Sequence, residues 1–211
     1  YWDAWQSPDL VLSQTCGYPY RTRLHGAVTL IGTPDYGLPG CPPGHYCSVF
    51  VARADDARRD LLQFDGARFA YNESLSQSGW AAPQRHAAAL GLHLPPEPAT
   101  GSHALSAAAV AEGRADIAAL DALTWILLQR YNPAAAGLRE VARTAPTPVL
   151  PYIGGPNADR AAMFAAIAEA IAQLGDDDRA TLHLRGLIDI APESYLSVPN
   201  PPSPDQIAQR Q

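Results

Sequence analysis

The pattern of apolar and polar positions predicts strands that alternate with helices along most of the chain. Short apolar runs bounded by turn residues are typical of strands, and they occupy residues 9–13, 25–32, 45–52, 68–71, 116–120 and 138–143. Segments with helical spacing occupy residues 80–90, 104–112, 122–130, 157–174 and 176–187. Alternation of this kind predicts an α/β fold with mixed, mainly parallel sheets.

Composition narrows the classes of partner. The 211 residues are 47% hydrophobic and 17% charged, which is enough apolar material for one or two domains with a well-packed core. The net charge is −6 and basic residues form no cluster, so we expect no nucleic-acid partner. We also expect no direct membrane insertion, because no apolar stretch is long enough to span a bilayer.

The two ends of the chain carry less information. The first residue is Tyr1, with neither an initiator Met nor a signal peptide, which indicates a processed or shortened end. The proline-rich segment Pro199–Pro204 predicts a poorly packed tail.

The cysteines leave two alternatives open. Cys41 and Cys47 flank a Pro-Pro-Gly turn, so a local disulfide is geometrically possible, and two reduced thiols are equally compatible with the sequence. Together with His45 these cysteines offer only three metal ligands, in a spacing unlike that of structural zinc sites. We therefore expect no metal and no cofactor.

The segment Tyr71–Gly79 (Tyr-Asn-Glu-Ser-Leu-Ser-Gln-Ser-Gly) is the first candidate for function. It joins a predicted strand to a predicted helix, so its hydroxyls and backbone N–H groups lie at a helix N-terminus, which attracts anions. Thr100–His103 (Thr-Gly-Ser-His) opens a second helix in the same way and adds an imidazole. Asp121 and Gln14–Cys16 also follow strands, where ligands bind in open α/β sheets.

Each of these residues also has an ordinary structural explanation. Ser76 and Ser78 are compatible with simple helix caps, and Asp121 with the N-cap of the next helix. His103 is compatible with an exposed first-turn residue, and Tyr46 with a half-buried core residue. Their joint placement along one rim of a sheet favours a binding site for a small anion.

Several segments of the chain resemble a known family, the periplasmic substrate-binding proteins of phosphate- and phosphonate-type ABC transporters. The segments are Arg68–Gly79, Thr100–Ser106, Val110–Asp121 and Arg143–Pro148. The Ser-x-Ser-Gly loop and the later Thr-Gly-x-His are moderately specific as a pair. The resemblance extends from about Asp9 to Leu187.

The resemblance implies a type 2 periplasmic-binding-protein-like fold, with two α/β lobes joined by two crossover strands. It places the first lobe at residues 1–52 plus 145–211 and the second, with both helix N-termini, at 53–144. The first lobe would lack its opening βα unit.

The resemblance also assigns ligand contacts. It implies that Ser76, Gln77, Ser78 and the N–H of Gly79 bind phosphoryl or phosphonyl oxygens and that His103 donates to the same oxygens. It further implies that Asp121 meets a ligand amine and that Tyr46 is an aromatic contact on the first crossover. In the first lobe the match is loose, and it implies contacts from Gln14, Thr15 and Cys16. Gln77 stands where a small hydroxyl residue is common, so sulfonate, carboxylate or heterocyclic ligands remain open.

The predicted function is the solute-binding component of an ABC importer, non-catalytic, with a small anionic ligand between two lobes and a transporter permease as partner. An exported, periplasmic location follows if a signal was removed, and a cytoplasmic one is also compatible. One alternative is an enzyme on the same scaffold, with Cys16 as nucleophile and His103 as base. Another is a cytosolic ligand sensor.

Overall fold

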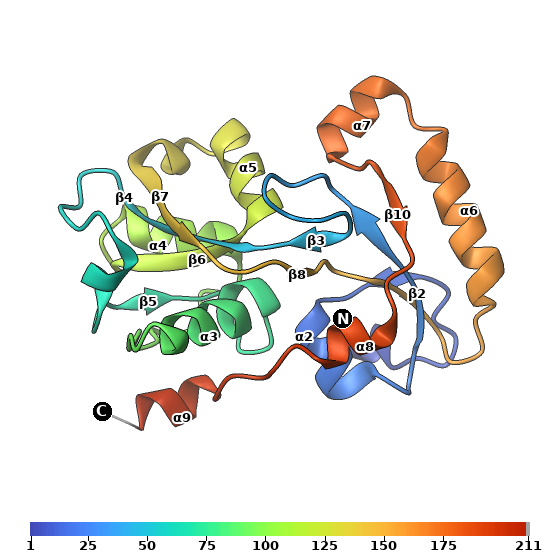
Figure 1. Ribbon diagram of the computed structural model, residues 1–211, viewed down its shortest axis with the longest axis horizontal. Coiled ribbons are helices and arrows are strands. Elements are labelled where there is room, and N and C mark those ends of the chain that lie inside the picture. Colours follow the sequence, from blue (N-terminus) through green and yellow to red (C-terminus); the bar gives the residue numbers. More distant parts are fainter. Residues whose placement is uncertain (210–211) are drawn as a thin grey trace. The chain divides into compact units, whose positions relative to one another are not determined.

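The computed structural model describes residues 1–209, which divide into two compact units (Figure 1). Unit 1 comprises Tyr1–Tyr46 and Pro146–Pro199. Unit 2 comprises Cys47–Ala145 and the chain from Asn200 onward. The chain therefore passes between the units at three points, after Tyr46, after Ala145 and after Pro199.

Unit 1 is built on a four-stranded sheet in the order β1-β9-β2-β10, in which every neighbouring pair is antiparallel. Its strands are β1 (Ser13–Gln14), β9 (Tyr152–Gly154), β2 (Thr29–Asp35) and β10 (Gly186–Ile188). A separate short ribbon pairs β3 (His45–Tyr46) with β8 (Thr147–Pro148). This ribbon adjoins two of the three points at which the chain leaves the unit.

Helices and aromatic residues cover the unit 1 sheet. Helix α6 (Arg160–Ala172) lies along β2 and β10 (Figure 1), and Gly32 permits its close approach, since a Cβ there would lie 2.9 Å from Phe164. A second cluster buries Tyr20, Leu24 and Tyr195. The Tyr195 hydroxyl donates to the Val149 carbonyl (2.8 Å) and so fixes the core to the segment that follows β8.

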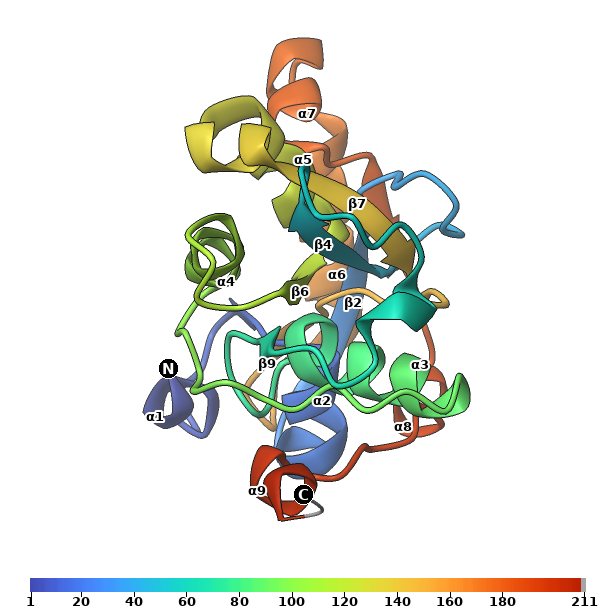
Figure 2. The ribbon, with the colours of Figure 1, turned by 90° about the vertical axis from the view of Figure 1, so that its left-hand side faces the viewer.

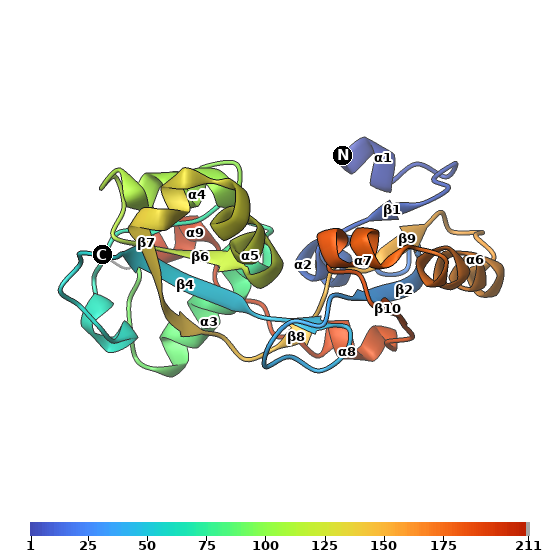
Figure 3. The ribbon, with the colours of Figure 1, turned by 90° about the horizontal axis from the view of Figure 1, so that it is seen from above.

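Unit 2 is built on a sheet in the order β5-β6-β4-β7. Its strands are β5 (Phe69–Ala70), β6 (Ile117–Asp121), β4 (Ser48–Arg53) and β7 (Leu138–Arg143). Helix α4 (His103–Ala111) covers one face together with α5 (Ala122–Tyr131), and α3 (Ala82–Ala89) lies on the other face (Figures 2 and 3). All five residues of β6 are buried, which places the core of the unit on both sides of this strand.

The remaining elements are short. They are α1 (Trp2–Trp5), α2 (Gly17–Pro19), η1 (Tyr20–Leu24), η2 (Leu61–Phe64), η3 (Gln77–Ala81), η4 (Pro133–Gly137), α7 (Asp176–Leu182), α8 (Pro192–Leu196) and α9 (Pro204–Ala208). Two of them, η1 and η3, are π-helical turns; η3 includes the nominated residues Gln77–Gly79, and η1 begins four residues after Cys16. Such turns are rare and occur frequently at functional sites.

The expectation of mainly parallel pairing is wrong for the described residues: among their named strands only β5 and β6 pair in parallel, beside two isolated parallel bridges. Strands β5, β6 and β7 do run in the same direction, as helical crossovers require. However, β4 enters unit 2 from unit 1 and lies between β6 and β7, antiparallel to both. The alternation rule describes local strand–helix–strand units, and β4 is not part of one.

Several boundaries also differ from the prediction. Residues 9–12 are not a strand, and Asp159 rather than Asn157 caps α6, because its Oδ1 accepts from Ala162 N (3.0 Å). The chain from Cys47 to Ala52 and from Asn200 onward groups with unit 2, not with the first lobe. The predicted tail, Pro199–Pro204, contains no buried residue, although Trp80 Nε1 donates to the Pro202 carbonyl (3.1 Å) and Ile207, beyond the tail, is buried. The segment 176–187 contains both α7 and β10.

Candidate functional site

The serine turn, Ser76–Ala81, is the first element of the candidate site. The Ser76 side chain caps η3 by accepting a hydrogen bond from Gly79 N (2.9 Å). The Ser76 carbonyl accepts from both Trp80 N (3.2 Å) and Ala81 N (2.9 Å), and the second bond widens the turn to a π-helix. Every residue from Ser76 to Ala81 is buried, so these hydroxyls and N–H groups belong to a structured interior turn.

A second loop is tied to the first. Thr100 N and Thr100 Oγ1 both donate to the Tyr71 carbonyl (2.9 and 3.0 Å), and Gly101 N donates to the Asn72 carbonyl (2.9 Å). Ser102 then caps α4 through a bond from Leu105 N (3.1 Å). These bonds bring together two helix N-termini whose residues Ser78 and His103 lie 25 positions apart in sequence.

His103 connects the two helix N-termini. It is the first residue of α4, and its Nε2 lies 3.0 Å from Ser78 Oγ, within hydrogen-bonding distance. The other ring nitrogen, Nδ1, is buried and has no hydrogen-bond partner among the described residues. The predicted proximity of Ser78 and His103 is therefore present in the structure.

Asp121 ends β6 and caps α5. Its Oδ1 accepts from Leu123 N (2.8 Å) and Thr124 N (3.0 Å), so the N-cap explanation of this residue is observed. Across the sheet Asp121 pairs directly with Ser48, and opposed residues of an antiparallel pair point to the same face. The Ser48 hydroxyl is buried and unpaired within the described chain, a feature that the sequence analysis did not find.

The electrostatics of this cluster are those of a desolvated polar site. Burial lowers the pKa of His103 below its usual value, and the nearby Asp121 carboxylate, the Ala119 carbonyl and Glu73 offset only part of that effect. Burial likewise raises the pKa of Asp121 above its usual value, against the opposing influence of His103. At neutral pH the imidazole is consequently uncharged.

Gly79 has a different role from the expected one. Its N–H is already bonded to Ser76 Oγ, so the implied contact of this N–H with a ligand is not available in this structure. The reason for glycine is steric, since a Cβ at this position would lie 1.8 Å from Asn72 Oδ1. Asn72 Oδ1 is buried and unpaired in the described residues, and it is a polar atom that the sequence analysis did not assign.

The predicted residues of unit 1 form a separate group. Gln14 Nε2 donates to the Leu150 carbonyl (2.9 Å) and to Tyr36 OH (3.2 Å). Cys16 Sγ lies 3.8 Å from the hydroxyl of Tyr46, which is almost fully buried. Thr15 Oγ1 is buried and lacks a partner in the chain as described. These residues are mutually close within unit 1, and π-helical η1 follows them closely.

Three further observations concern the cysteines, metal-binding groups and helix length. Cys16, Cys41 and Cys47 form no disulfide within the described part of the chain. Residues 1–209 contain no group of three or more acidic, His or Cys side chains arranged to hold a metal ion. In the same range no helix is both long and apolar enough to cross a membrane.

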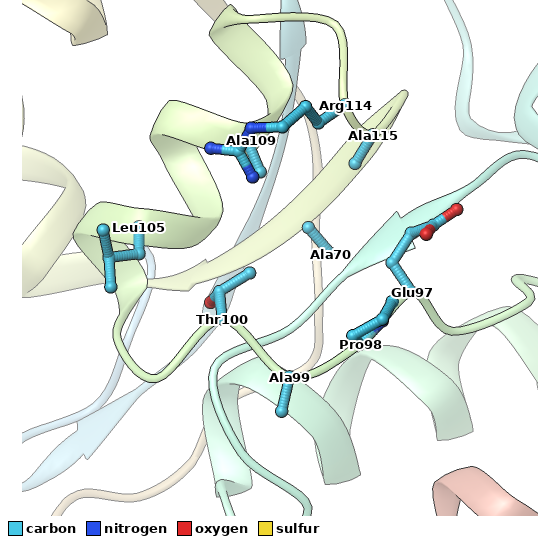
Figure 4. Close-up of a pocket in the computed structure, with 9 residues that line it drawn as sticks. All are labelled: Ala70, Glu97, Pro98, Ala99, Thr100, Leu105, Ala109, Arg114 and Ala115. Carbon is cyan, nitrogen blue, oxygen red and sulfur yellow. The ribbon is translucent and has the colours of Figure 1, made fainter.

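A surface hollow of about 370 Å³ adjoins the second loop but does not coincide with the candidate site. Figure 4 shows small side chains, among them Ala70, Ala99 and Ala115, in the lining of this hollow together with Arg114 and Glu97. Thr100 contributes to this hollow, whereas Ser78, His103 and Asp121 do not. The candidate site therefore comprises the serine turn, His103 and Asp121.

Two capped helix N-termini, a neutral imidazole and a buried acid suit a small anion with a polar organic group. The family model of the periplasmic substrate-binding proteins of phosphonate ABC transporters matches residues 6–194. The chain belongs to this family. It is thus the substrate-binding component of a phosphonate-type ABC transporter, and family members are binding proteins rather than catalysts. The enzyme alternative based on Cys16 and His103 is therefore set aside.

Solved structures of related proteins show the same type 2 periplasmic-binding-protein-like fold. PhnD1 from Prochlorococcus marinus, in complex with methylphosphonate, aligns with a TM-score of 0.77 at 16% identity, covering 98% of this chain and 80% of that one. XAC2383 from Xanthomonas citri, bound to chloride, aligns with a TM-score of 0.68 at 18% identity, covering 95% and 76%.

A third structure is a binding protein component of an ABC phosphonate transporter from Pseudomonas aeruginosa. It aligns with a TM-score of 0.68 at 17% identity, covering 88% of this chain and 65% of that one. No curated protein matches the sequence. At these identities the likeness to solved structures establishes the fold, and the ligand has to be argued from the residues of the site.

Proposed function

We propose that the protein binds a small phosphonate-type anion (a phosphonate, a phosphate ester or a similar oxyanion) at the serine turn and delivers it to an ABC permease. The observation that carries this proposal is the 3.0 Å contact between Ser78 Oγ and His103 Nε2, which joins two helix N-termini. Helix N-termini present N–H groups and a positive dipole end, and both favour an anion.

The oxyanion would be bound by hydroxyl, imidazole and N–H donors. Ser76 Oγ accepts the Gly79 N–H, which leaves its own proton for a ligand oxygen. When His103 Nε2–H donates to Ser78 Oγ, the Ser78 proton is likewise directed to the ligand. The sequence contains no lysine, and within residues 1–209 the interactions of Ser78 and His103 involve no arginine. Charge would thus be balanced by dipoles rather than by a cation.

Asp121 would recognise a hydrogen-bond donor on the organic part of the ligand. Its carboxyl group is buried, so keeping it charged is costly even with the two backbone N–H groups bonded to Oδ1, and its pKa is accordingly raised. A ligand amine or hydroxyl beside the carboxyl group would reduce this cost. A divalent anion without an amine or hydroxyl would bind with less favourable free energy, because it would lie beside the acidic side chain of Asp121. The unit 1 residues Gln14, Thr15, Cys16 and Tyr46 stay predicted contacts.

The location and the partner are part of the same proposal. Periplasmic export and a membrane permease fit the family, and a cytosolic sensor with the same pocket is the alternative. Cell fractionation of the native gene product separates them, because a sensor of this kind would remain in the cytosol.

Isothermal titration calorimetry tests the ligand class. We expect methylphosphonate or a phosphate monoester to bind with micromolar or tighter affinity, ahead of sulfonates and dicarboxylates. Ser78→Ala should weaken binding by roughly 10- to 100-fold, since a hydrogen bond to a charged group contributes about 1.5–3 kcal/mol.

Ser74→Ala is the matched control, because Ser74 belongs to the same loop but is exposed. It should bind as the wild type does. Absence of binding to every anion in this panel, or equal affinities of the Ser78 and Ser74 variants, would refute the proposal.

A further inference from the structure

The C-terminal segment, Asn200–Gln209, docks on the back of the serine turn. Trp80 Nε1 donates a hydrogen bond to the Pro202 carbonyl (3.1 Å), and Ile207 of α9 is buried. Asp205 is close enough to add to the effect of burial in raising the pKa of Tyr71. Figure 1 shows α9 beside α3, within the same unit.

The residue that receives the tail is itself part of the turn. Trp80 is fully buried and follows Ser78 and Gly79 directly. Its ring packs against Tyr71, with the ring centroids 4.8 Å apart. Any displacement of this indole is thus transmitted, within two residues, to the hydroxyl that contacts His103.

The serine turn needs such support because of its geometry. A π-helical turn is less favourable than an α-helical one and persists where tertiary contacts stabilise it. The Phe69 ring lies 6.4 Å from that of Trp80, and two closer contacts hold Trp80, namely the tilted Tyr71 ring and the Pro202 carbonyl at its N–H. The first comes from the loop that precedes the turn, and the second comes from the tail.

The tail is pre-ordered but docks through few contacts. A reciprocal capping box between Ser203 and Gln206 starts α9, and Pro201, Pro202 and Pro204 restrict the undocked chain. Ile207 is the buried side chain of α9, and a hollow of about 330 Å³ separates Asn200–Pro202 from α3. Few buried contacts make local undocking accessible without global unfolding.

We propose that this segment is a positioning strap, whose docking on Trp80 maintains the serine turn in the geometry that binds the anion. The strap is attached to unit 1 through the crossing after Pro199, so it connects unit 1 directly to the binding turn. The inference rests on the proposed function for its effect on affinity, but its structural effect on the turn is measurable without a ligand.

The test compares three variants with the wild type: a chain ending at Pro199, Ile207→Ala, and the control Gln209→Ala, whose side chain is exposed at the end of α9. Methylphosphonate affinity is measured by calorimetry at 25 °C, where circular dichroism verifies that each variant is folded. We expect the first two to bind about 3- to 10-fold more weakly and the control to bind as the wild type does.

Hydrogen exchange in the ligand-free protein is the second readout. Loss of the strap should accelerate exchange of the Trp80 indole N–H and of the Trp80 and Ala81 amides, which bond to Ser76, while β6 amides remain protected. Faster exchange supports the strap even if methylphosphonate does not bind, an outcome that would count against the proposed ligand alone. Unchanged exchange at these groups in the truncated chain would overturn the inference, as would unchanged affinity for a ligand that the wild type binds.

Discussion

Replacement of Gly79 by alanine is the most direct test of how the serine turn is built. The new Cβ would lie 1.8 Å from Asn72 Oδ1, 2.9 Å from Asn72 Cγ and 3.1 Å from Ser76 Oγ. The first two distances are shorter than any normal contact, so the Asn72 side chain must move. Its Oδ1 is buried beside the turn, so the displacement also disturbs the serine cap.

The expected cost follows from overpacking. Introducing a methyl group into a packed interior costs about 1–3 kcal/mol, whereas alanine in place of glycine within a helical turn otherwise gains up to about 1 kcal/mol. We expect Gly79→Ala to be less stable by about 1–2 kcal/mol in urea unfolding. Because Ser76 and Ser78 shift with the turn, methylphosphonate should bind about tenfold more weakly by calorimetry.

Two further variants give this prediction its controls. Gly137→Ala introduces the same group where nothing lies within 4 Å, and it should not reduce stability or binding. The double variant Asn72→Ala with Gly79→Ala removes the atoms that clash, so it should recover most of the stability lost by Gly79→Ala alone. If Gly79→Ala behaves like Gly137→Ala, the close approach of Asn72 does not constrain the turn and this reasoning is wrong.

Three other predictions concern pH, acid stability and the loop tie. An oxyanion beside Ser78 should raise the pKa of His103, which burial lowers in the free protein, so binding takes up protons and weakens as pH rises. Calorimetry in buffers of different ionisation enthalpy should detect this uptake, and His103→Gln should abolish the part that the ligand and Asp121 do not supply. The hydrogen bond with Arg58 is the main reason that the pKa of Asp56 is lowered to about 2. The ionised carboxylate therefore stabilises the folded protein above pH 4, and this stability is lost as pH falls towards 2. Asp56→Asn should lower the free energy of unfolding by about 2 kcal/mol at pH 7, and an equal decrease at pH 7 and pH 2 would contradict this explanation. Thr100→Val removes the hydroxyl bonds to the Tyr71 carbonyl and Ser106 Oγ (3.0 and 2.7 Å) but keeps the backbone bond from Thr100 N. We expect a loss of about 1–2 kcal/mol in the free energy of unfolding and weaker anion binding, and an unchanged affinity would refute the role of these hydroxyl bonds.

Some elements could be predicted because their signals are local. The segment Leu138–Arg143 is a strand with the predicted bounds, and α4 and α5 begin within a residue of their predicted starts. Ser76, Ser102 and Asp121 cap helices because a short polar side chain before an apolar segment satisfies the first N–H groups. Their position next to strands placed them along one rim of the sheet.

Other features depend on contacts between distant segments, and no local pattern encodes them. Ser48 is opposite Asp121 only because β4 lies beside β6, and the sequence of β4 reads as an ordinary buried strand. Similarly, the proline-rich tail has the composition of an unpacked end, yet Trp80 and Ile207 anchor it. In both cases the deciding partner lies more than 60 residues away.

The sequence by itself determined the α/β class, the family and the polar side chains at the helix starts, since propensity, capping and motif spacing act over a few residues. Tertiary structure decided the strand directions, the bond between Ser78 and His103 and the reason for glycine at position 79. The physical cause is that burial and close approach depend on which segments pack together, and those same effects set the pKa values of His103 and Asp121.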